Sequence, residues 1–228
     1  MWASLKLWAG DKMNKKAKLN LLFDLDGCLI DSSEVQKAAF FGSYDRIVGD
    51  ANCPSWEEYI KHTGDSVDNV LKKLGLPAEM APVFREISGK SVDKITVNRE
   101  ATDLVKEFKQ KGCGTAIVTG KDHYRTADIL KYYEIEDYFD ILVCADDVSE
   151  PKPSPMPIIK ALNELHSAAE DAVVIGDGYN DILSAKGAGV RSILTLWFGD
   201  EGVPREADYT VGSVKELRAV LTDLYFGD

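Results

Sequence analysis

Residues 19–28 read Leu-Asn-Leu-Leu-Phe-Asp-Leu-Asp-Gly-Cys, a short apolar run that ends in two aspartates, one residue apart, and a glycine. A run of this length, bounded by a turn-forming residue, predicts a buried β-strand. A buried carboxylate needs a metal, a cation or hydrogen bonds, because leaving it unpaired costs on the order of several kcal/mol. Two interpretations of Asp24 and Asp26 stay open on this stretch alone. The strand ends either in a solvated acidic turn or in a ligand-binding site, since open α/β sheets bind ligands at the carboxyl ends of their strands.

The composition limits the classes of partner. The chain has 228 residues, 45% of them hydrophobic, which is enough for a substantial core in one large domain or two smaller ones. It carries 27 lysines and arginines against 38 aspartates and glutamates, a net charge of −11. A chain this acidic argues against DNA or RNA as a partner. A small anion can still bind where the site itself is locally positive.

The sequence also indicates where the protein resides. No apolar run is long enough to span a bilayer, and residues 1–18 lack the pattern of a signal peptide, so we treat them as an N-terminal extension. The four cysteines show neither C-x-x-C pairs nor zinc-ligand spacing. We therefore expect reduced thiols in a cytoplasmic protein that has no membrane partner. We also expect a monomer or a homodimer.

Beyond the first strand the chain divides into a helical part and an alternating part. Asp31 and Glu34 form a predicted capping box for a helix over residues 32–48. Residues 49–98 show helical spacing with no strand signal, which predicts an inserted helical bundle. After residue 98, strands alternate with amphipathic helices, so we expect a parallel sheet with helices on both faces. The later strands are expected at 115–119, 141–144, 172–176, 191–196 and 209–211.

Polar residues follow four of the expected strands. They are Asp24 with Asp26, Thr119 with Gly120, Lys152 between two prolines, and the run from Asp177 to Asp181. Each alone is typical of an ordinary turn, a helix cap or a solvated lysine. Because the carboxyl ends of parallel strands share one edge of the sheet, their joint occurrence predicts a single site.

The predicted site has the composition of a magnesium and phosphate site. Mg²⁺ prefers a few carboxylates together with waters and a substrate phosphate, and Asp24, Asp177 and a backbone carbonyl near Asp26 can supply the protein share. The Thr119 hydroxyl and the amides that open the next helix can hold phosphoryl oxygens. Lys152 can neutralise both a phosphoryl group and a carboxylate nucleophile. Positioning and charge neutralisation are what phosphoryl transfer mainly requires.

These four segments resemble the four motifs of the haloacid dehalogenase (HAD) superfamily. They are Phe23 to Gly27, Val118 to Gly120, Lys152 with Pro153, and Gly176 to Asp181. The helical insertion resembles the cap of the phosphoglycolate phosphatase-like branch. The resemblance covers the chain after residue 18 and implies an α/β fold, a HAD-like Rossmannoid doubly wound parallel sheet with an inserted α-helical cap. The implied catalytic core is 19–30 and 99–228, and the implied cap is 31–98.

The resemblance also implies a role for each motif residue. Asp24 would be the nucleophile that forms an aspartyl-phosphate, and Asp26 would be the general acid and then the general base. Lys152 would steady Asp24 and, with Thr119, bind the phosphoryl group. Gly120 and Lys121 belong to or follow the second motif and are substrate-binding candidates, although a solvated residue on a helix is an equally good interpretation of Lys121. The implied Mg²⁺ ligands are Asp24, the Asp26 backbone carbonyl and Asp177, with Asp181 acting through water or Lys152.

Asp26 discriminates among the activities of the superfamily. Dehalogenases typically lack this second aspartate, and P-type ATPases carry lysine-threonine after the nucleophile. The resemblance therefore implies an Mg²⁺-dependent phosphatase acting on a small phosphorylated metabolite, with a phosphomutase of the β-phosphoglucomutase type as the alternative. Such mutases are expected to carry an arginine in the cap loop and a histidine soon after the first motif, and this chain has neither. A non-catalytic phosphate-sensing protein is a third possibility, against which an intact Asp26 argues.

The cap sequence bears on the substrate. The segment His62-Thr63-Gly64-Asp65-Ser66 resembles the specificity loop of such caps, so His62 is a candidate substrate contact. Residues 56–62 and 74–77 are similar to phosphatases associated with aminohydroxybenzoate biosynthesis, which suggests a phosphorylated sugar or cyclised acid. A histidine at a helix end or on the cap surface is an equally good interpretation of His62.

Overall fold

The computed structural model describes residues 19–49, 52–199 and 206–226, so the N-terminal extension lies outside the described residues. Within them, six parallel strands form one sheet in the order β5-β4-β1-β6-β7-β8. The strands of this sheet are β1 (Asn20–Phe23), β4 (Gly114–Val118), β5 (Ile141–Val143), β6 (Ala172–Gly176), β7 (Arg191–Thr195) and β8 (Tyr209–Val211). This is the α/β fold with a parallel sheet that the sequence predicted.

Strand β1 lies inside the sheet, and its register carries the first motif to the sheet edge. Phe23 is paired with Ile117 of β4 on one side and with Ile175 of β6 on the other. All four residues of β1 are buried, as expected for a parallel strand that has both faces covered. The Asp24 amide still donates to the Ile175 carbonyl oxygen at 2.8 Å, so Asp24 is the first residue beyond the strand.

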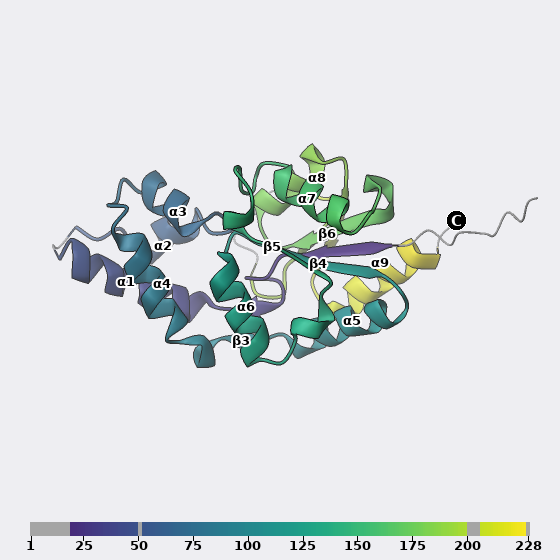
Figure 1. Ribbon diagram of the computed structural model, residues 1–228, viewed down its shortest axis with the longest axis horizontal. Helices are drawn as coiled ribbons and strands as arrows, with labels where there is room; N and C mark the ends of the chain where they lie inside the picture. The colour runs from purple at the N-terminus through teal and green to yellow at the C-terminus, as the bar shows by residue number, and fades with distance from the viewer. Residues whose placement is uncertain (1–18, 50–51, 200–205, 227–228) are drawn as a thin grey trace, which may run out of the picture.

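Helices cover both faces of the sheet (Figure 1). The helices on one face are α5 (Arg99–Gln110), α6 (His123–Tyr132) and α9 (Val214–Phe226), and those on the other are α7 (Met156–Glu164) and α8 (Tyr179–Gly187). Alternate residues of β1 enter the two layers: Leu21 and Phe23 pack with the first group, and Leu22 packs with the second. The period-two alternation of side chains along a strand therefore divides one short run between two hydrophobic cores.

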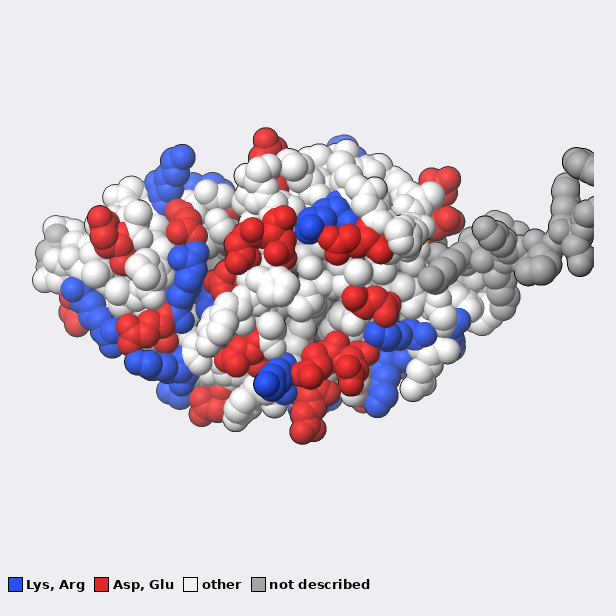
Figure 2. All heavy atoms as spheres, in the orientation of Figure 1, with Lys and Arg blue, Asp and Glu red and all other residues white. Residues whose placement is uncertain are grey.

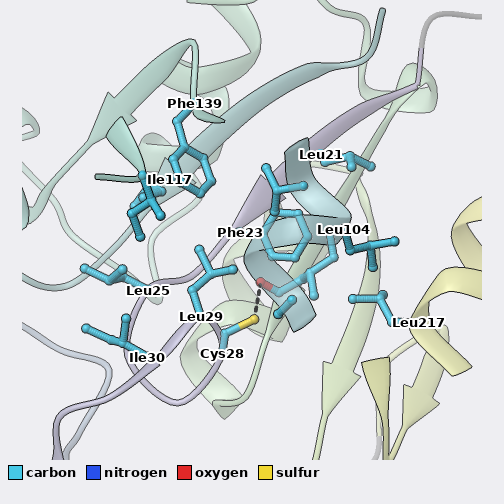
Figure 3. Packing of buried hydrophobic residues seen from close by; sticks show 14 of the residues in the cluster. Leu21, Phe23, Leu25, Cys28, Leu29, Ile30, Leu104, Ile117, Phe139 and Leu217 are labelled. Carbon is cyan, nitrogen blue, oxygen red and sulfur yellow. Dashed lines mark hydrogen bonds between the residues drawn. The ribbon is translucent and has the colours of Figure 1, made fainter. Parts of the chain in front are cut away.

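The larger core packs around Phe23. Figure 3 shows its ring among Leu21, Leu104 of α5 and Leu217 of α9, all fully buried or nearly so. The Cys28 thiol lies below this group and donates to the Ile175 carbonyl oxygen at an S–O distance of 3.8 Å. Burial raises the pKa of Cys28 well above its usual value, so this residue is a neutral packing group.

The helical insertion forms a second lobe. It leaves the core at β2 (Ile30–Asp31) and returns at β3 (Thr96–Val97), which pair as an antiparallel ribbon. Its helices are α1 (Ser33–Ile47), α2 (Trp56–Ile60), α3 (Val67–Lys73) and α4 (Met80–Gly89). They enclose their own hydrophobic cluster, separate from the two sheet cores, and lie to the left of the sheet in Figure 1. We propose to divide core from cap at this ribbon, close to the bounds expected from the sequence.

The ribbon and the start of α1 correct two details of the sequence analysis. The segment 49–98 is not wholly helical, because Thr96 and Val97 form β3. The predicted capping box is wrong: Ser32 precedes α1, and its side chain makes no capping hydrogen bond. The Asp31 carboxylate accepts from the Ser33 amide at 2.9 Å, and the Ser32 hydroxyl is engaged with Asp26 instead.

The other strand predictions hold. β6 and β8 have the expected bounds, β5 and β7 end one residue earlier than expected, and β4 begins and ends one residue earlier. Among the described residues, no helix combines the length and the apolar composition that crossing a bilayer requires. Acidic and basic side chains are interspersed on the face drawn in Figure 2, which shows no continuous basic surface of the kind that nucleic-acid backbones need.

Removing the ring of Phe108 tests the packing of α5 on the sheet. Phe108 is fully buried, whereas Tyr124 on α6 is 76% exposed. We expect Phe108→Ala to lower the free energy of unfolding by about 3–5 kcal/mol, because a cavity replaces the ring. The control Tyr124→Ala should change it by no more than about 0.5 kcal/mol. Urea denaturation measures both, and equal effects would contradict this account of the core.

Candidate active site

A cavity of about 880 Å³ lies between the carboxyl edge of the sheet and the cap. Core residues of three of the four motifs line its floor: Asp24, Asp26, Gly27, Thr119, Gly120, Asp177, Gly178 and Asn180. The fourth motif contributes Lys152, which is buried behind the floor. The parallel sheet therefore brings together segments that are up to 153 residues apart in the sequence, counted from Asp24 to Asp177.

A buried ammonium group organises the floor. The Lys152 Nζ lies 3.1 Å from Asp24 Oδ1 and 2.5 Å from Asp181 Oδ1, and it donates to the Val118 carbonyl oxygen at 3.1 Å. Burial alone would lower the pKa of Lys152, but Asp181 and Asp24 outweigh it and raise that pKa. Lys152 is therefore charged and holds both carboxylates at the edge of the cavity.

Asp24 points one oxygen into this ion pair. Its Oδ1 also accepts from the Leu25 amide at 2.7 Å. Burial raises the pKa of Asp24 to about 7, against the lowering effect of Lys152 and with the help of the nearby Asp181 and Asp26. The described hydrogen bonds and ion pair of the Asp24 side chain all use Oδ1, which leaves Oδ2 without a described partner.

Asp26 has a separate set of partners. Its Oδ2 lies 2.9 Å from the Lys121 ammonium, and its Oδ1 accepts a hydrogen bond from the Ser32 hydroxyl. Burial would raise the pKa of Asp26, but Lys121 and the Ser32 hydrogen bond outweigh it and lower that pKa. The two aspartates of the first motif, one residue apart in the sequence, therefore differ in their electrostatic surroundings.

Asp177 lies over the backbone of the first motif. A Cβ atom on Gly27 would stand 1.8 Å from Asp177 Oδ2, so only glycine leaves room for this carboxylate. Gly27 also has a φ of +72°, a left-handed conformation that glycine adopts without strain. Asp181 approaches Gly176 in a similar way, at 2.4 Å between the added Cβ and Cγ, and its Oδ2 accepts from the Gly178 amide at 3.0 Å.

The carboxylates of the floor fit a divalent cation. Asp24, Asp177 and Asp181 each offer an oxygen within 4.8 Å of the others, and Lys152 is the ammonium among them. Burial, followed by Asp24 and Asp181, raises the pKa of Asp177 well above its usual value. Asp24 and Asp181 are buried and Asp177 is half-buried; when all three are ionised, one ammonium leaves two negative charges unbalanced. Oxygen ligands of this kind select hard cations such as Mg²⁺.

The loop after β4 joins the floor to the cap. The Thr119 hydroxyl oxygen accepts from the Lys121 amide at 3.3 Å. A Cβ atom on Gly120 would lie 2.7 Å from the Gly64 carbonyl oxygen, so the cap loop rests directly on the core backbone here. Any side chain larger than that of glycine at this position would push the two lobes apart.

A second contact holds the cap beside the cavity. Arg125 of α6 donates to Asp122 Oδ2 at 2.6 Å and to the Ser88 hydroxyl at 3.2 Å, while Arg85 of α4 approaches the same Asp122 oxygen at 3.3 Å. Burial would raise the pKa of Asp122, but the neighbouring Arg125 and Arg85 outweigh it, so the carboxylate stays charged between them.

The structure places most of the predicted site residues together. Asp24, Asp26, Thr119, Gly120, Lys121, Lys152, Asp177 and Asp181 converge, whereas His62 is not among the residues that line the cavity. The sequence predicts no contact for Ser32, whose hydroxyl donates to Asp26. Its only signal is a hydroxyl residue soon after the first motif, at the expected start of a helix.

Comparisons with known proteins agree with this geometry. A sequence model described as haloacid dehalogenase-like hydrolase matches residues 21–195. The chain is 34% identical over 180 residues to a PpaX protein of Caldanaerobacter subterraneus, and the match covers 78% of this chain and 81% of that one. It is 30% identical over 215 residues to the pyrophosphatase PpaX of Bacillus pumilus, covering 92% and 99%.

A solved structure shares the fold and binds phosphate. CbbY from Rhodobacter sphaeroides in complex with phosphate superposes with a TM-score of 0.78 at 26% identity, covering 87% of this chain and 95% of that one. A mutant of the same protein was solved in complex with xylulose-(1,5)bisphosphate, with the same TM-score at 25% identity and the same coverage.

Substituting Gly27 tests the close approach of Asp177. We expect Gly27→Ala to displace the Asp177 carboxylate and to abolish most activity. The control is Gly75→Ala, because Gly75 has a similar φ of +68° but no described atom within 4 Å of an added Cβ. Both variants should lose about 1–2 kcal/mol of stability from the left-handed backbone, and only Gly27→Ala should lose turnover. Turnover lost equally in both would contradict the contact.

Proposed function

The chain belongs to the haloacid dehalogenase-like hydrolases, and from this premise we propose that it is an Mg²⁺-dependent phosphatase that hydrolyses a small phosphorylated metabolite through an aspartyl-phosphate. Its phosphatase relatives support the activity in general. The observation that carries the specific proposal is the separation of Asp24 and Asp26. Asp24 is paired with Lys152 within the group of carboxylates that could hold a metal ion. Asp26 is paired with Lys121 and accepts a hydrogen bond from Ser32.

We assign the first step to Asp24. Its Oδ2 attacks phosphorus while the bond between phosphorus and the leaving oxygen breaks, and Asp26 gives a proton to that oxygen. Lys152 fixes Asp24 Oδ1 and keeps the carboxylate oriented. The Thr119 hydroxyl is placed to donate to a phosphoryl oxygen. A divalent cation held by Asp24, Asp177 and the Asp26 backbone carbonyl, with Asp181 behind, would neutralise the phosphoryl charge.

The second step regenerates Asp24. Asp26 takes a proton from a water that attacks phosphorus, the acyl-phosphate bond breaks, and inorganic phosphate leaves. The lowered pKa keeps Asp26 ionised, which is the state that can accept this proton. Acting as an acid in the first step requires it to be protonated. A phosphoryl group that draws the Lys121 ammonium away from Asp26 would raise its pKa in the complex, which is the change that the acid role needs.

The alternatives receive less support. A mutase needs a second phosphate-binding group in the cap, and the only basic residue among the described cap residues that line the cavity is Lys61, which is exposed. A non-catalytic phosphate sensor has no use for a carboxylate held as Asp26 is. We also propose a cytoplasmic location, which the spacing of the cysteines in the sequence supports.

Replacing the nucleophile tests the mechanism. We expect Asp24→Asn to lower kcat for 4-nitrophenyl phosphate by at least about a thousand-fold, because the neutral amide cannot form the acyl-phosphate. The matched control is Asp137→Asn, an exposed residue distant from the motifs, which should keep full activity. Circular dichroism should show that both variants are folded. Turnover retained in Asp24→Asn would refute the covalent route, and isomerised sugar phosphate as the main product would favour the mutase.

Removing the metal tests the cation. Excess EDTA should abolish phosphate release, and Mg²⁺ should restore it better than Ca²⁺, which is larger and takes more ligands. Added Mg²⁺ should also raise the melting temperature of the wild type, because an ion that binds only the folded state stabilises it. The shift should be smaller in Asp177→Asn. Full activity in EDTA would rule out the metal-dependent mechanism.

A further inference from the structure

The cavity has two chemically different halves. Its floor holds the charged motif residues described above. The cap residues that line the cavity include polar ones, among them Gln36, Thr63 and Asp65. Six others are aromatic or aliphatic and form what we call the roof: Trp56, Tyr59 and Ile60 of α2, Val67 and Val70 of α3, and Phe84 of α4. A group attached to the phosphoryl oxygen and pointing away from the floor would therefore meet apolar surface.

The roof is a packed aromatic unit. The Trp56 and Tyr59 rings are stacked, with centroids 4.9 Å apart and an interplanar angle of 14°. The centroid of the Tyr59 ring also lies 4.6 Å from that of Phe40 and 6.3 Å from that of Phe84. Tyr59 and Phe84 are buried, and Trp56 is half-buried. Rings fixed in this way present a rigid face, which binds a flat or cyclic ligand group at little cost in side-chain entropy.

The roof has little capacity for a second phosphate. Among the described residues that line the cavity, the basic ones are Lys61, Lys121 and Arg125. Lys121 is paired with Asp26, and Arg125 is engaged by Asp122 and Ser88. Lys61, the residue after α2, is exposed, and the acidic Glu57 of α2 lines the same cavity. Phosphate groups are usually held by several unpaired cations or by bidentate arginine, and these residues do not supply such a set.

We propose that the substrate is the phosphomonoester of an organic alcohol with an apolar ring, and that the leaving group carries no second phosphate. This rests on the proposed function and narrows it. The reaction breaks the bond between phosphorus and the alcohol oxygen, consumes one water, and yields the free alcohol and inorganic phosphate. Pyrophosphate fits the cavity poorly, since it would fill a small part of about 880 Å³ and leave the aromatic roof unused. On this proposal the chain prefers a different substrate from pyrophosphate, the compound after which its PpaX relatives are named.

Four probes separate the alternatives: benzyl phosphate, glycerol phosphate, inorganic pyrophosphate and xylulose bisphosphate. We expect kcat/KM for benzyl phosphate to exceed the values for the other three by at least about tenfold, since burying a ring against the roof contributes one decade of affinity or more. Benzyl and glycerol phosphate are both esters of primary alcohols, so their comparison reports on binding of the leaving group.

Two cap variants locate the effect. Trp56→Ala should raise KM for benzyl phosphate about tenfold or more and leave kcat/KM for glycerol phosphate within about twofold, because only the ring contact is lost. The matched control is Phe41→Ala, a partly exposed cap aromatic that does not line the cavity, which should change neither value. A Trp56→Ala variant that merely disrupts the cap would lose activity on both esters, and its melting temperature would show it.

In Glu57→Lys, KM for xylulose bisphosphate should fall while KM for benzyl phosphate stays unchanged. Glu57 is exposed, so the substitution adds a cation beside the roof without disturbing the packing. Equal kcat/KM for benzyl and glycerol phosphate, or a preference for pyrophosphate or the bisphosphate, would overturn the inference and leave the proposed phosphatase intact. No hydrolysis of any of the four probes would overturn the proposed function itself.

Discussion

The charge on Lys152 is the constraint on which the site depends. An ammonium group buried to this degree is stable only if carboxylates surround it, and Asp24 after β1 and Asp181 in the first turn of α8 do so. The same ammonium offsets part of the repulsion between those carboxylates. Neither side can therefore be removed without leaving a buried charge unpaired. The site and the carboxyl edge of the sheet are stabilised by one shared interaction, which fixes the position of Asp24 before any ligand arrives.

Close backbone approaches set the remaining geometry. At Gly27 the chain makes room for Asp177, at Gly176 for Asp181, and at Gly120 for the carbonyl of Gly64 in the cap loop. In the first two contacts a carboxylate lies directly against the backbone, Asp177 against Gly27 and Asp181 against Gly176. The third places the cap on the loop that carries Thr119 and Lys121. Substrate-facing cap residues are thus positioned relative to the chemistry through backbone contact, while the aromatic cluster of the cap gives them rigidity.

The sequence was informative where chemistry follows from strand topology. A parallel sheet brings all carboxyl ends to one edge, so the convergence of Asp24, Thr119, Lys152 and Asp177 could be predicted without coordinates. Side-chain pairing could not. The sequence favours Asp31 as a helix cap and gives no sign that the Ser32 hydroxyl donates to Asp26, because both contacts depend on the angle at which β2 enters α1. The pairing of Lys121 with Asp26 and the absence of His62 from the cavity lining depend likewise on loop conformations that no periodicity encodes.

Because the floor and the roof of the cavity are built differently, two members of this family can share the chemistry of the floor and still act on different substrates. The floor is built from strand ends and their glycines, where almost any substitution leaves a buried charge unpaired or a clash. The roof is built from helices of the cap, where one apolar side chain can replace another if the volume is kept. Identities of 25–34% to proteins named for pyrophosphate or solved with a bisphosphate are therefore compatible with a common floor and a different roof. Trp56, Tyr59 and Phe84 then carry more information about the leaving group than any motif residue does, because they touch the part of the substrate that the shared chemistry does not.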